Sequence, residues 1–355
     1  METKCNLTGI NPSFALCICT YKRVDLLEKL ILDVLVQTLQ PGILIIVDGD
    51  PSSGQVLQKL QMLRFPSKMA VHIIPSNHSN LAYQRYLGWK VASRLSYKYL
   101  VYLDDDLRPS ELDTLRNLVK PLEAGERVTA VTANIMYSPI QMDSKDNGLI
   151  KLLGDSWRYR PGSVTATGNR IPVVFDGNDY VAVDCLSGGA MALLTAALSD
   201  RVFSRDLFSI YEKKIGKGED TILSLRLKES RSFLFAFNSV FWHLDSQPIA
   251  YPTDGFKKGY AIAYSRRMIN DNYRGFSHPL MSDRLALYKS YLGNILVNVL
   301  NILRVPDKFH FHFALGYLRG AVHGILAQPT TKALTPDIDW FNDSCNSVSK
   351  DVILQ

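Results

Sequence analysis

Short apolar runs alternate with amphipathic segments over the first 110 residues, and this alternation limits the folds open to the chain. The apolar runs cover residues 14–20, 43–47, 71–74 and 99–103, and each has the length of a strand. Leucine, isoleucine and valine recur at helical spacing between the first two runs, and residues 81–95 form a second helical segment. Strands without alternating polarity are buried on both faces, as in a parallel sheet between two layers of helices. We therefore expect an α/β fold with a mostly parallel, Rossmann-like sheet flanked by helices.

Polar residues stand directly after three of these apolar runs. Thr20 and Tyr21 close the first run, Asp48 closes the second, and the fourth leads into three consecutive aspartates at 104–106. Ligands of open α/β sheets bind beyond the carboxyl ends of the strands. The three polar groups thus predict a single binding site at that end of the sheet.

The aspartate triplet is the strongest chemical signal in the first half of the chain. Three adjacent carboxylates repel one another unless a cation lies nearby. Alternate residues of an extended segment share a face, so Asp104 and Asp106 can point into the same site. Hard oxygen ligands suit Mg²⁺ or Mn²⁺, and these cations also bind diphosphates. A solvated acidic turn before Arg108 explains the same residues without a metal.

Four sequence blocks resemble glycosyltransferase family 2 in their order and spacing. They read CTYKR at residues 19–23, IIVDGD at 45–50, NLAYQRYLG at 80–88 and YLVYLDDD at 99–106. The resemblance implies the GT-A fold and a nucleotide-sugar-dependent, hexosyltransferase-like enzyme that inverts the anomeric centre. It also implies a divalent metal cofactor, Mn²⁺ or Mg²⁺.

The resemblance assigns roles to individual residues in these blocks. Thr20 and Asp48 would meet the nucleotide, Arg85 would lie near its phosphates, and Asp104 would lie near the ribose or sugar. Asp106 would bind the metal. The full donor-binding set implied is Thr20, Tyr21, Arg23, Asp48, Arg85, Asp104, Asp105, Gly188 and Gly189. A turn-stabilising Asp48 and a helix-surface Arg85 are the simpler alternatives.

A glycine-rich segment and a histidine in the second half extend the match. Residues 187–191 resemble the family's glycine-rich strand beneath the donor sugar, where a missing Cβ allows close approach of a ligand. A β-bulge explains these glycines equally well. His243 follows a strand-like run and is implied as a second metal ligand beside Asp106, although a core or rim histidine is the plainer interpretation.

An acidic pair before a short helical segment is the candidate catalytic group. Asp220 follows Gly218-Glu219 and precedes Thr-Ile-Leu, and the resemblance implies that it is the general base, with Glu219 as the next candidate. An aspartate at this place is also a good helix N-cap. The chemistry and the capping role remain open at this point.

The chain divides by composition into a sheet domain and a helical extension. We expect a GT-A catalytic domain at 1–250, with a nucleotide-binding half at 1–110 and an acceptor or catalytic half at 111–250. A helical extension should cover 251–330, and a flexible tail should cover 331–355. The extension is basic; its cations include Lys257, Lys258, Arg266, Arg267, Arg274, Arg304, Lys308 and Arg319.

The net charge and the cysteine pattern limit the classes of partner and the cellular compartment that we expect. The net charge of +6 suits a nucleotide diphosphate and allows weak attraction to an anionic membrane. There is no dense basic run or zinc-finger spacing, so we expect no nucleic-acid partner. Five unpatterned cysteines indicate a reducing compartment, and the polar N-terminus has no signal-peptide core. We therefore expect a cytoplasmic protein, free or peripheral at the inner face of the membrane.

These observations predict an enzyme that moves a sugar from a nucleotide-diphosphate donor to an acceptor hydroxyl in glycan or surface-polysaccharide synthesis. The acceptor would be a glycan or a lipid-linked sugar. One alternative is a sugar nucleotidyltransferase, but such enzymes usually carry a glycine-rich loop where this chain has Thr-Tyr-Lys-Arg. The other is a non-catalytic carbohydrate-binding protein on the same fold, which the presence of both Asp106 and Asp220 disfavours.

Overall fold

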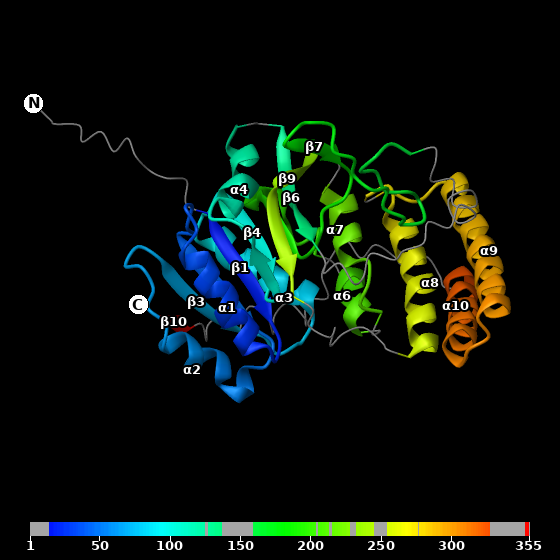
Figure 1. Cartoon of the computed structure of the whole chain (residues 1–355), viewed down its shortest axis with the longest axis horizontal. Coiled ribbons are helices and arrows are strands. Elements are labelled where there is room, and N and C mark those ends of the chain that lie inside the picture. The colour runs from blue at the N-terminus through cyan, green and yellow to red at the C-terminus, as the bar shows by residue number, and fades with distance from the viewer. Residues whose placement is uncertain are drawn as a thin grey trace, which may run out of the picture.

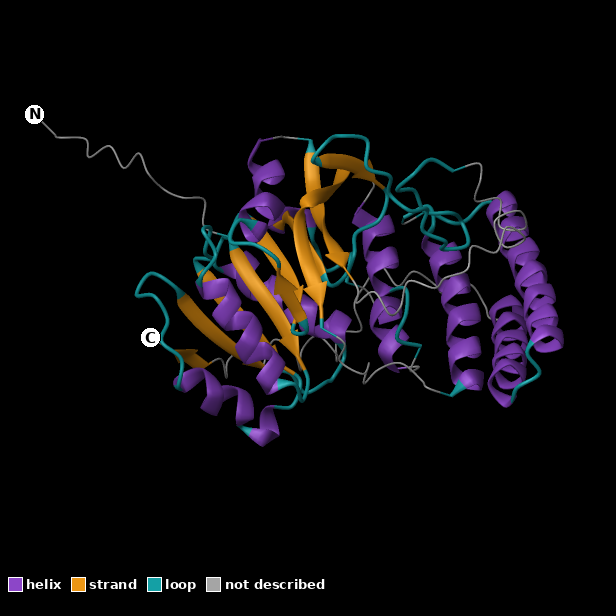
Figure 2. Ribbon diagram, in the orientation of Figure 1, coloured by secondary structure: helices purple, strands orange, loops and turns teal. Residues whose placement is uncertain are grey.

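The computed structural model describes residues 14–124, 127–136, 159–203, 205–212, 215–227, 232–244, 254–275, 277–326 and 352–354. These residues form one twisted sheet, helices on both of its faces, and a group of three helices at one end (Figures 1 and 2). The strands are β1 Ala15–Thr20, β2 Ile43–Asp48, β3 Ala70–Pro75, β4 Tyr99–Asp104, β5 Leu107–Pro109, β6 Val128–Met136, β7 Tyr180–Val183, β8 Ala190–Leu194, β9 Ser232–His243 and β10 Val352–Leu354.

The first half of the sheet is parallel, as the apolar runs predict. Strands β3, β2, β1 and β4 lie in that order, and every pair among them is parallel. In register, Thr20 pairs with Asp48 and Cys19 pairs with Asp104. The carboxyl ends of three strands therefore lie at one edge, with their polar residues side by side.

The second half of the sheet is mixed rather than parallel. Strand β8 runs antiparallel to both β4 and β6, and β9 is parallel to β6 but antiparallel to β5 and β7. An antiparallel neighbour begins where the adjacent strand ends, so Ala190 lies opposite Leu103 and His243 lies opposite Leu107. This arrangement brings the glycine-rich segment and His243 to the aspartate triplet.

Helices cover both faces of the sheet and create two apolar clusters. The helical segments are α1 Val24–Leu35, η1 Pro51–Ser53, α2 Gln55–Gln61, α3 Leu81–Arg94, α4 Thr114–Ala124, η4 Thr195–Ala197, α6 Arg205–Glu212, α7 Glu219–Leu227, α8 Gly255–Asn272, α9 Met281–Arg304 and α10 Lys308–Leu326. Cys17 and Cys19 point into one cluster with Tyr86, whereas Leu16 and Ile18 point into the other. Both cysteines are free and buried, as core residues of a strand should be.

Helices α8, α9 and α10 form the predicted helical extension. Helices α8 and α10 pack with their backbones almost in contact, because small residues line the crossing. A Cβ on Gly259 would lie 2.1 Å from the carbonyl oxygen of Phe313, and one on Gly316 would lie 1.9 Å from that of Phe256. Among the described helices, none is both long and apolar enough to cross a membrane.

The C-terminal end differs from the expected flexible tail. Strand β10 pairs antiparallel with β3, with Val352 opposite Ile73, and so adds an edge strand to the parallel half of the sheet. Residues 331–351 of the expected tail, and the proposed domain boundary near residue 250, lie outside the described residues. The domain boundaries therefore stay predictions.

Candidate active site

The carboxyl ends of β1 and β4 are joined by hydrogen bonds around the acidic turn. Thr20 Oγ1 donates to Asp105 Oδ2 at 2.7 Å. Arg23 Nη1 lies 2.8 Å from Asp106 Oδ2 and 3.3 Å from Asp105 Oδ1. Burial raises the pKa of the Asp105 carboxyl to about 7, and the Thr20 hydrogen bond acts against this rise. Asp105 therefore ties the turn to β1, while Arg23 supplies positive charge to the triplet.

The end of β2 closes the same edge of the sheet. Asp48 is buried, and its Oδ1 accepts a hydrogen bond from the backbone N–H of Asp50 at 2.9 Å. Burial raises its pKa above the ordinary value. This contact stabilises the turn, as the simpler interpretation holds, and the contact with a base stays a prediction. Gln84, which no sequence signal marked, donates from Nε2 to the carbonyl oxygens of Thr20 at 3.1 Å and Val47 at 3.3 Å.

Arg85 connects the acidic turn to the glycine-rich segment. Its side chain on α3 is only 3 % exposed, so it is not a helix-surface cation. Nη2 donates to Asp104 Oδ1 at 3.0 Å and to the carbonyl oxygen of Gly188 at 2.7 Å. A Cβ on Gly188 would lie 3.1 Å from both Arg85 Nη1 and the Cβ of Asp220. A larger residue at this position would force Arg85 or Asp220 to move by a few tenths of an ångström.

Gly189 joins the glycine-rich segment to the aspartate triplet. Its carbonyl oxygen accepts a hydrogen bond from the backbone N–H of Asp104 at 2.8 Å. A Cβ at this position would lie 2.9 Å from Ile135 Cδ1 and 3.4 Å from Asp104 Oδ2. Both glycines thus permit chain packing at the site, whether or not a ligand also approaches them.

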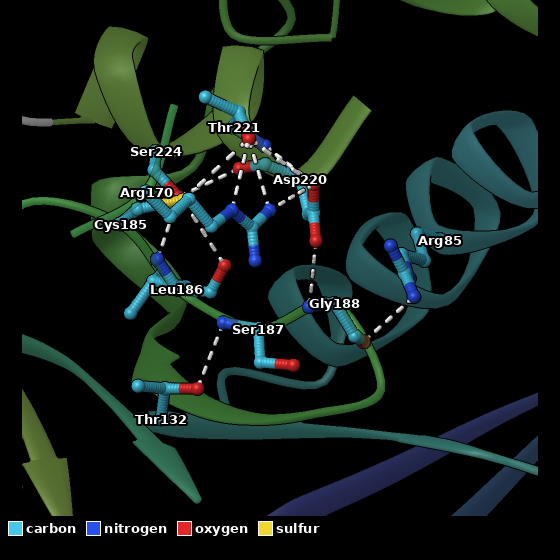
Figure 3. A network of polar contacts seen from close by, with 10 residues as sticks. All are labelled: Arg85, Thr132, Arg170, Cys185, Leu186, Ser187, Gly188, Asp220, Thr221 and Ser224. Carbon is cyan, nitrogen blue, oxygen red and sulfur yellow. Dashed lines mark hydrogen bonds and ion pairs between the residues drawn. The ribbon is translucent and has the colours of Figure 1, made fainter. Parts of the chain in front are cut away.

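Asp220 lies in the first turn of α7 and is held by three donors (Figure 3). Its Oδ1 accepts from the N–H of Thr221 at 2.7 Å and pairs with Arg170 Nη2 at 2.5 Å, and its Oδ2 accepts from the N–H of Gly188 at 3.2 Å. Burial acts to raise the pKa of Asp220, but Arg170, the Gly188 hydrogen bond and Arg85 together outweigh it and hold the pKa below its ordinary value. Asp220 is therefore favoured in its ionised form beside the glycine-rich segment, and it lies inside α7 rather than at the N-cap position, because the helix begins at Glu219.

Glu219 has the opposite electrostatic character, although it is the adjacent residue. Burial raises its pKa to about 7, the negative charge of Asp220 adds to this rise, and Arg85 opposes it. The acidic pair thus holds one carboxylate that is firmly ionised and one that titrates near neutrality. Two acids with separated pKa values are typical of sites that handle protons.

Arg170 is a partner of the candidate base that sequence reasoning missed. It lies in the irregular segment after residue 159, where it forms a β-bridge with Val164. Its Nη2 also donates to Thr221 Oγ1 at 2.9 Å, so Arg170 contacts both Asp220 and Thr221 at the start of α7. No motif surrounds it in the sequence, and only the fold brings it to Asp220.

His243 and Asp106 face each other across the β5–β9 pair. His243 Nε2 lies 3.7 Å from Asp106 Oδ1, and Nδ1 lies 3.1 Å from the carbonyl oxygen of Leu244. A carbonyl can only accept, so Nδ1 carries a proton that points to Leu244, and Nε2 is the ring nitrogen that faces Asp106. Within the part of the chain that the structure describes, no group of three His, Cys, Asp or Glu side chains is placed to hold a metal.

Residues 15–171 match the family model described as "Glycosyl transferase family 2". These residues form a family 2 glycosyltransferase domain. The match spans the parallel half of the sheet and all four blocks that carried the resemblance, so the predicted family domain and glycosyltransferase activity are confirmed, while inversion stays a prediction. It ends at Ile171, directly after Arg170, and leaves the acidic pair and His243 outside the matched region.

Solved structures that align with most of this chain include other glycosyltransferases. A mannosyltransferase, PcManGT from Pyrobaculum calidifontis in complex with GDP-Man and Mn²⁺, is 13% identical, with a TM-score of 0.49 and coverage of 89% of this chain and 87% of that one. S. aureus TarS 1–349 in complex with UDP-GlcNAc is 10% identical, with a TM-score of 0.45 and coverage of 88% and 91%. Likeness at this level does not identify the substrates of this glycosyltransferase. A search of curated proteins finds no match.

Proposed function

We propose that this glycosyltransferase inverts the anomeric centre by direct displacement, with the acidic pair at the start of α7 providing the base. The observation that carries the proposal is the short path from base to donor site. Asp220 Oδ2 binds the N–H of Gly188, and the carbonyl of that same glycine binds Arg85, which pairs with Asp104. Gly188 thus links the candidate base directly to Arg85, one of the residues that would hold the donor.

In the proposed reaction, an acceptor hydroxyl attacks the anomeric carbon from the side opposite the diphosphate. The new carbon–oxygen bond forms as the bond to the diphosphate oxygen breaks, and the diphosphate leaves with the bonding electrons. The hydroxyl proton passes to Asp220, which is ionised before the reaction because Arg170 lowers its pKa. Glu219 is the second candidate, since a base with a pKa near the working pH is well matched to proton transfer.

Asp106 and His243 fit a divalent cation, Mn²⁺ or Mg²⁺, in this proposal. They offer a hard carboxylate oxygen and an imidazole nitrogen, Nε2, that faces it. Two protein ligands suit a metal that completes its coordination with phosphate oxygens and water. The cation would neutralise the negative charge on the departing diphosphate. Arg23, which already contacts Asp106, would support the same charge.

The donor would lie along the carboxyl ends of β1, β2 and β4. Asp48 and Tyr21 would flank the nucleotide, and Asp104 would face the ribose or sugar. We assign Asp105 to holding the turn, because its two oxygens already face Thr20 and Arg23. The acceptor in this proposal is the hydroxyl of a glycan or of a lipid-linked sugar, and no nucleic acid takes part.

The test is a panel of nucleotide sugars incubated with Mn²⁺, with Mg²⁺ or with a chelator. We expect nucleoside diphosphate release from at least one donor, its loss with the chelator, and a product of inverted anomeric configuration by NMR. Retained configuration would contradict the displacement mechanism. Consumption of a nucleoside triphosphate and a sugar phosphate with pyrophosphate release would indicate a nucleotidyltransferase instead. Sugar binding without turnover would indicate a carbohydrate-binding protein.

A further inference from the structure

Exposed apolar side chains are concentrated on α9, on α10 and at their flanking turns. Of the 25 large apolar side chains exposed in the described residues, 17 lie between Leu280 and Leu326. On α9 they recur at three- and four-residue spacing, at Met281, Leu285, Tyr288, Leu292, Leu296 and Leu303. On α10 the same spacing places Phe311, Leu315, Leu318, Val322 and Ile325 together. Such spacing puts each series on one side of its helix, and we name the two series together the apolar face.

The apolar face points away from the rest of the protein. The opposite side of α9 packs inward through the buried side chains of Leu287 and Tyr291, and that of α10 packs inward through Gly316 and Tyr317. In Figure 1, α9 and α10 lie at the far end of the molecule from the parallel strands. Each helix therefore has one side committed to the fold and one large apolar side left for a partner.

Positive charge accompanies the apolar face. Residues 281–326 contain five cations and two acids, a net charge of 5 − 2 = +3. Lys289, Arg304, Lys308 and Arg319 are exposed. Of the acids, Asp283 is buried against Arg274 at 2.6 Å, and Asp307 lies beside His310. The exposed charged side chains of residues 281–326 are thus four cations and one acid, Asp307.

We propose that the apolar face docks on an anionic lipid bilayer, with α9 and α10 lying along its surface. Amphipathic helices with basic polar sides bind in this way, because apolar side chains enter the acyl boundary and cations meet the headgroups. A second copy of the chain fits less well, since a symmetric contact would bring two surfaces of like charge together. One side of each helix is fixed to the protein, so docking is peripheral.

The docking helices are linked by hydrogen bonds to the loop that holds the candidate base. Asn270 of α8 donates from Nδ2 to the carbonyl oxygens of Ala166 at 2.9 Å and Asp283 at 2.8 Å, so it joins the start of α9 to that loop. Arg266 Nη1 donates to Asn169 Oδ1 at 2.9 Å, next to Arg170. In this proposal the bilayer contacts the same helical extension that holds this loop in place. This inference deepens the proposed function, on which it rests: the acceptor is a lipid-linked sugar.

The test is sedimentation of the full chain with vesicles of phosphatidylcholine alone or mixed with phosphatidylglycerol. We expect preferential binding to the mixed vesicles. A variant with Leu285→Glu, Leu292→Glu and Leu303→Glu should lose roughly tenfold or more in partitioning. Its matched control carries Val36→Glu, Met62→Glu and Leu112→Glu, three apolar residues 62%, 69% and 57% exposed elsewhere, and should bind as wild type does. Neutralising Arg304 and Lys308 with glutamine should weaken binding by roughly fivefold each at low salt.

The proposal would be overturned if wild type did not bind anionic vesicles, or if the two triple variants bound them equally. A dimer in light scattering that the first triple variant dissociates would assign the face to a second copy instead. Nucleotide diphosphate binding, measured by calorimetry without lipid, should be the same in all three proteins. If wild type did not bind a nucleoside diphosphate, the proposed function would be contradicted, and the vesicle experiment would still test membrane docking by itself.

Discussion

Arg170 Nη2 lies 2.5 Å from Asp220 Oδ1 and fixes that carboxylate at the start of α7. The pair joins a loop at the end of the matched family region to the residue that the family resemblance implies as the base. Because Asp220 also accepts from the N–H of Gly188, the ion pair positions the carboxylate and sets its charge at once. The first predictions concern this relationship.

Removing the charge of Arg170 should move the pH dependence of transfer. The pKa of Asp220 is held low by Arg170, so Arg170→Met should raise it. If Asp220 must be ionised to act, the acidic limb of the kcat profile should shift to higher pH. Arg170→Lys, which keeps the charge but not the fork of donors, should shift it less. If the acidic limb does not shift in Arg170→Met, the ion pair does not control the ionisation on which transfer depends.

Asp220→Asn should fold and bind the donor but lose most of the transfer rate. An amide cannot take the proton, and general-base catalysis contributes roughly 10²–10⁴-fold. The substitution also leaves Arg170 without its carboxylate, so the control is the double variant Arg170→Met with Asp220→Asn, compared with Arg170→Met alone. Near-normal transfer by Asp220→Asn would remove this residue from the mechanism and transfer the role of base to Glu219.

Glu219→Gln should stabilise the protein at high pH. The folded pKa of Glu219 is raised from 4.5 to about 7, so the fold favours its protonated form. The wild type should therefore lose stability as pH rises from about 4.5 to 7, and a neutral glutamine should not. We expect the Glu219→Gln substitution to leave Tm unchanged at about pH 4 and to raise it at about pH 8. A difference in Tm that is independent of pH would show that packing, not titration, is responsible.

Asp106→Ala should abolish metal-dependent transfer and weaken nucleotide diphosphate binding. Asp106 supplies the carboxylate of the proposed metal pair, and His243 completes it at 3.7 Å. Calorimetry with and without Mn²⁺ should show that the metal no longer strengthens nucleotide diphosphate binding in this variant. His243→Ala should show the same loss in milder form. A variant whose affinity still rises with Mn²⁺ would place the metal on other residues.

Charge reversal at Lys257 and Lys258 should lower transfer to the acceptor and leave nucleotide affinity unchanged. Both are exposed at the start of α8. Burial, together with the charges of Lys258 and Arg266, lowers the pKa of Lys217, which precedes the acidic pair by two residues in the chain. Arg267 is unsuitable for this test, because it is buried 3.0 Å from Asp271 and its reversal should unfold the extension. Equal loss of transfer and nucleotide affinity would contradict a role confined to the acceptor.

Much of the fold and of the donor side was readable in the sequence. Strands buried on both faces leave uninterrupted apolar runs, so β1, β2 and β4 were predictable from residue order alone. The residues that end those strands, Thr20, Asp48 and Asp104, follow directly in the chain. Parallel register then places them at one edge with no further information, because neighbouring parallel strands end together.

The partners and the electrostatics of the acidic pair, and the approach of His243 to Asp106, were decided only by the tertiary structure. Arg170 meets Thr221 across 51 residues, and Gln84 meets the carbonyl oxygen of Thr20 across 64. Such contacts depend on how an irregular loop or a buried helix side packs, and neither leaves a periodic pattern. The mixed half of the sheet is similar, because strand direction depends on the path between strands and not on their composition. Local sequence determined which groups exist at this site, and long-range packing determined their partners and their charge.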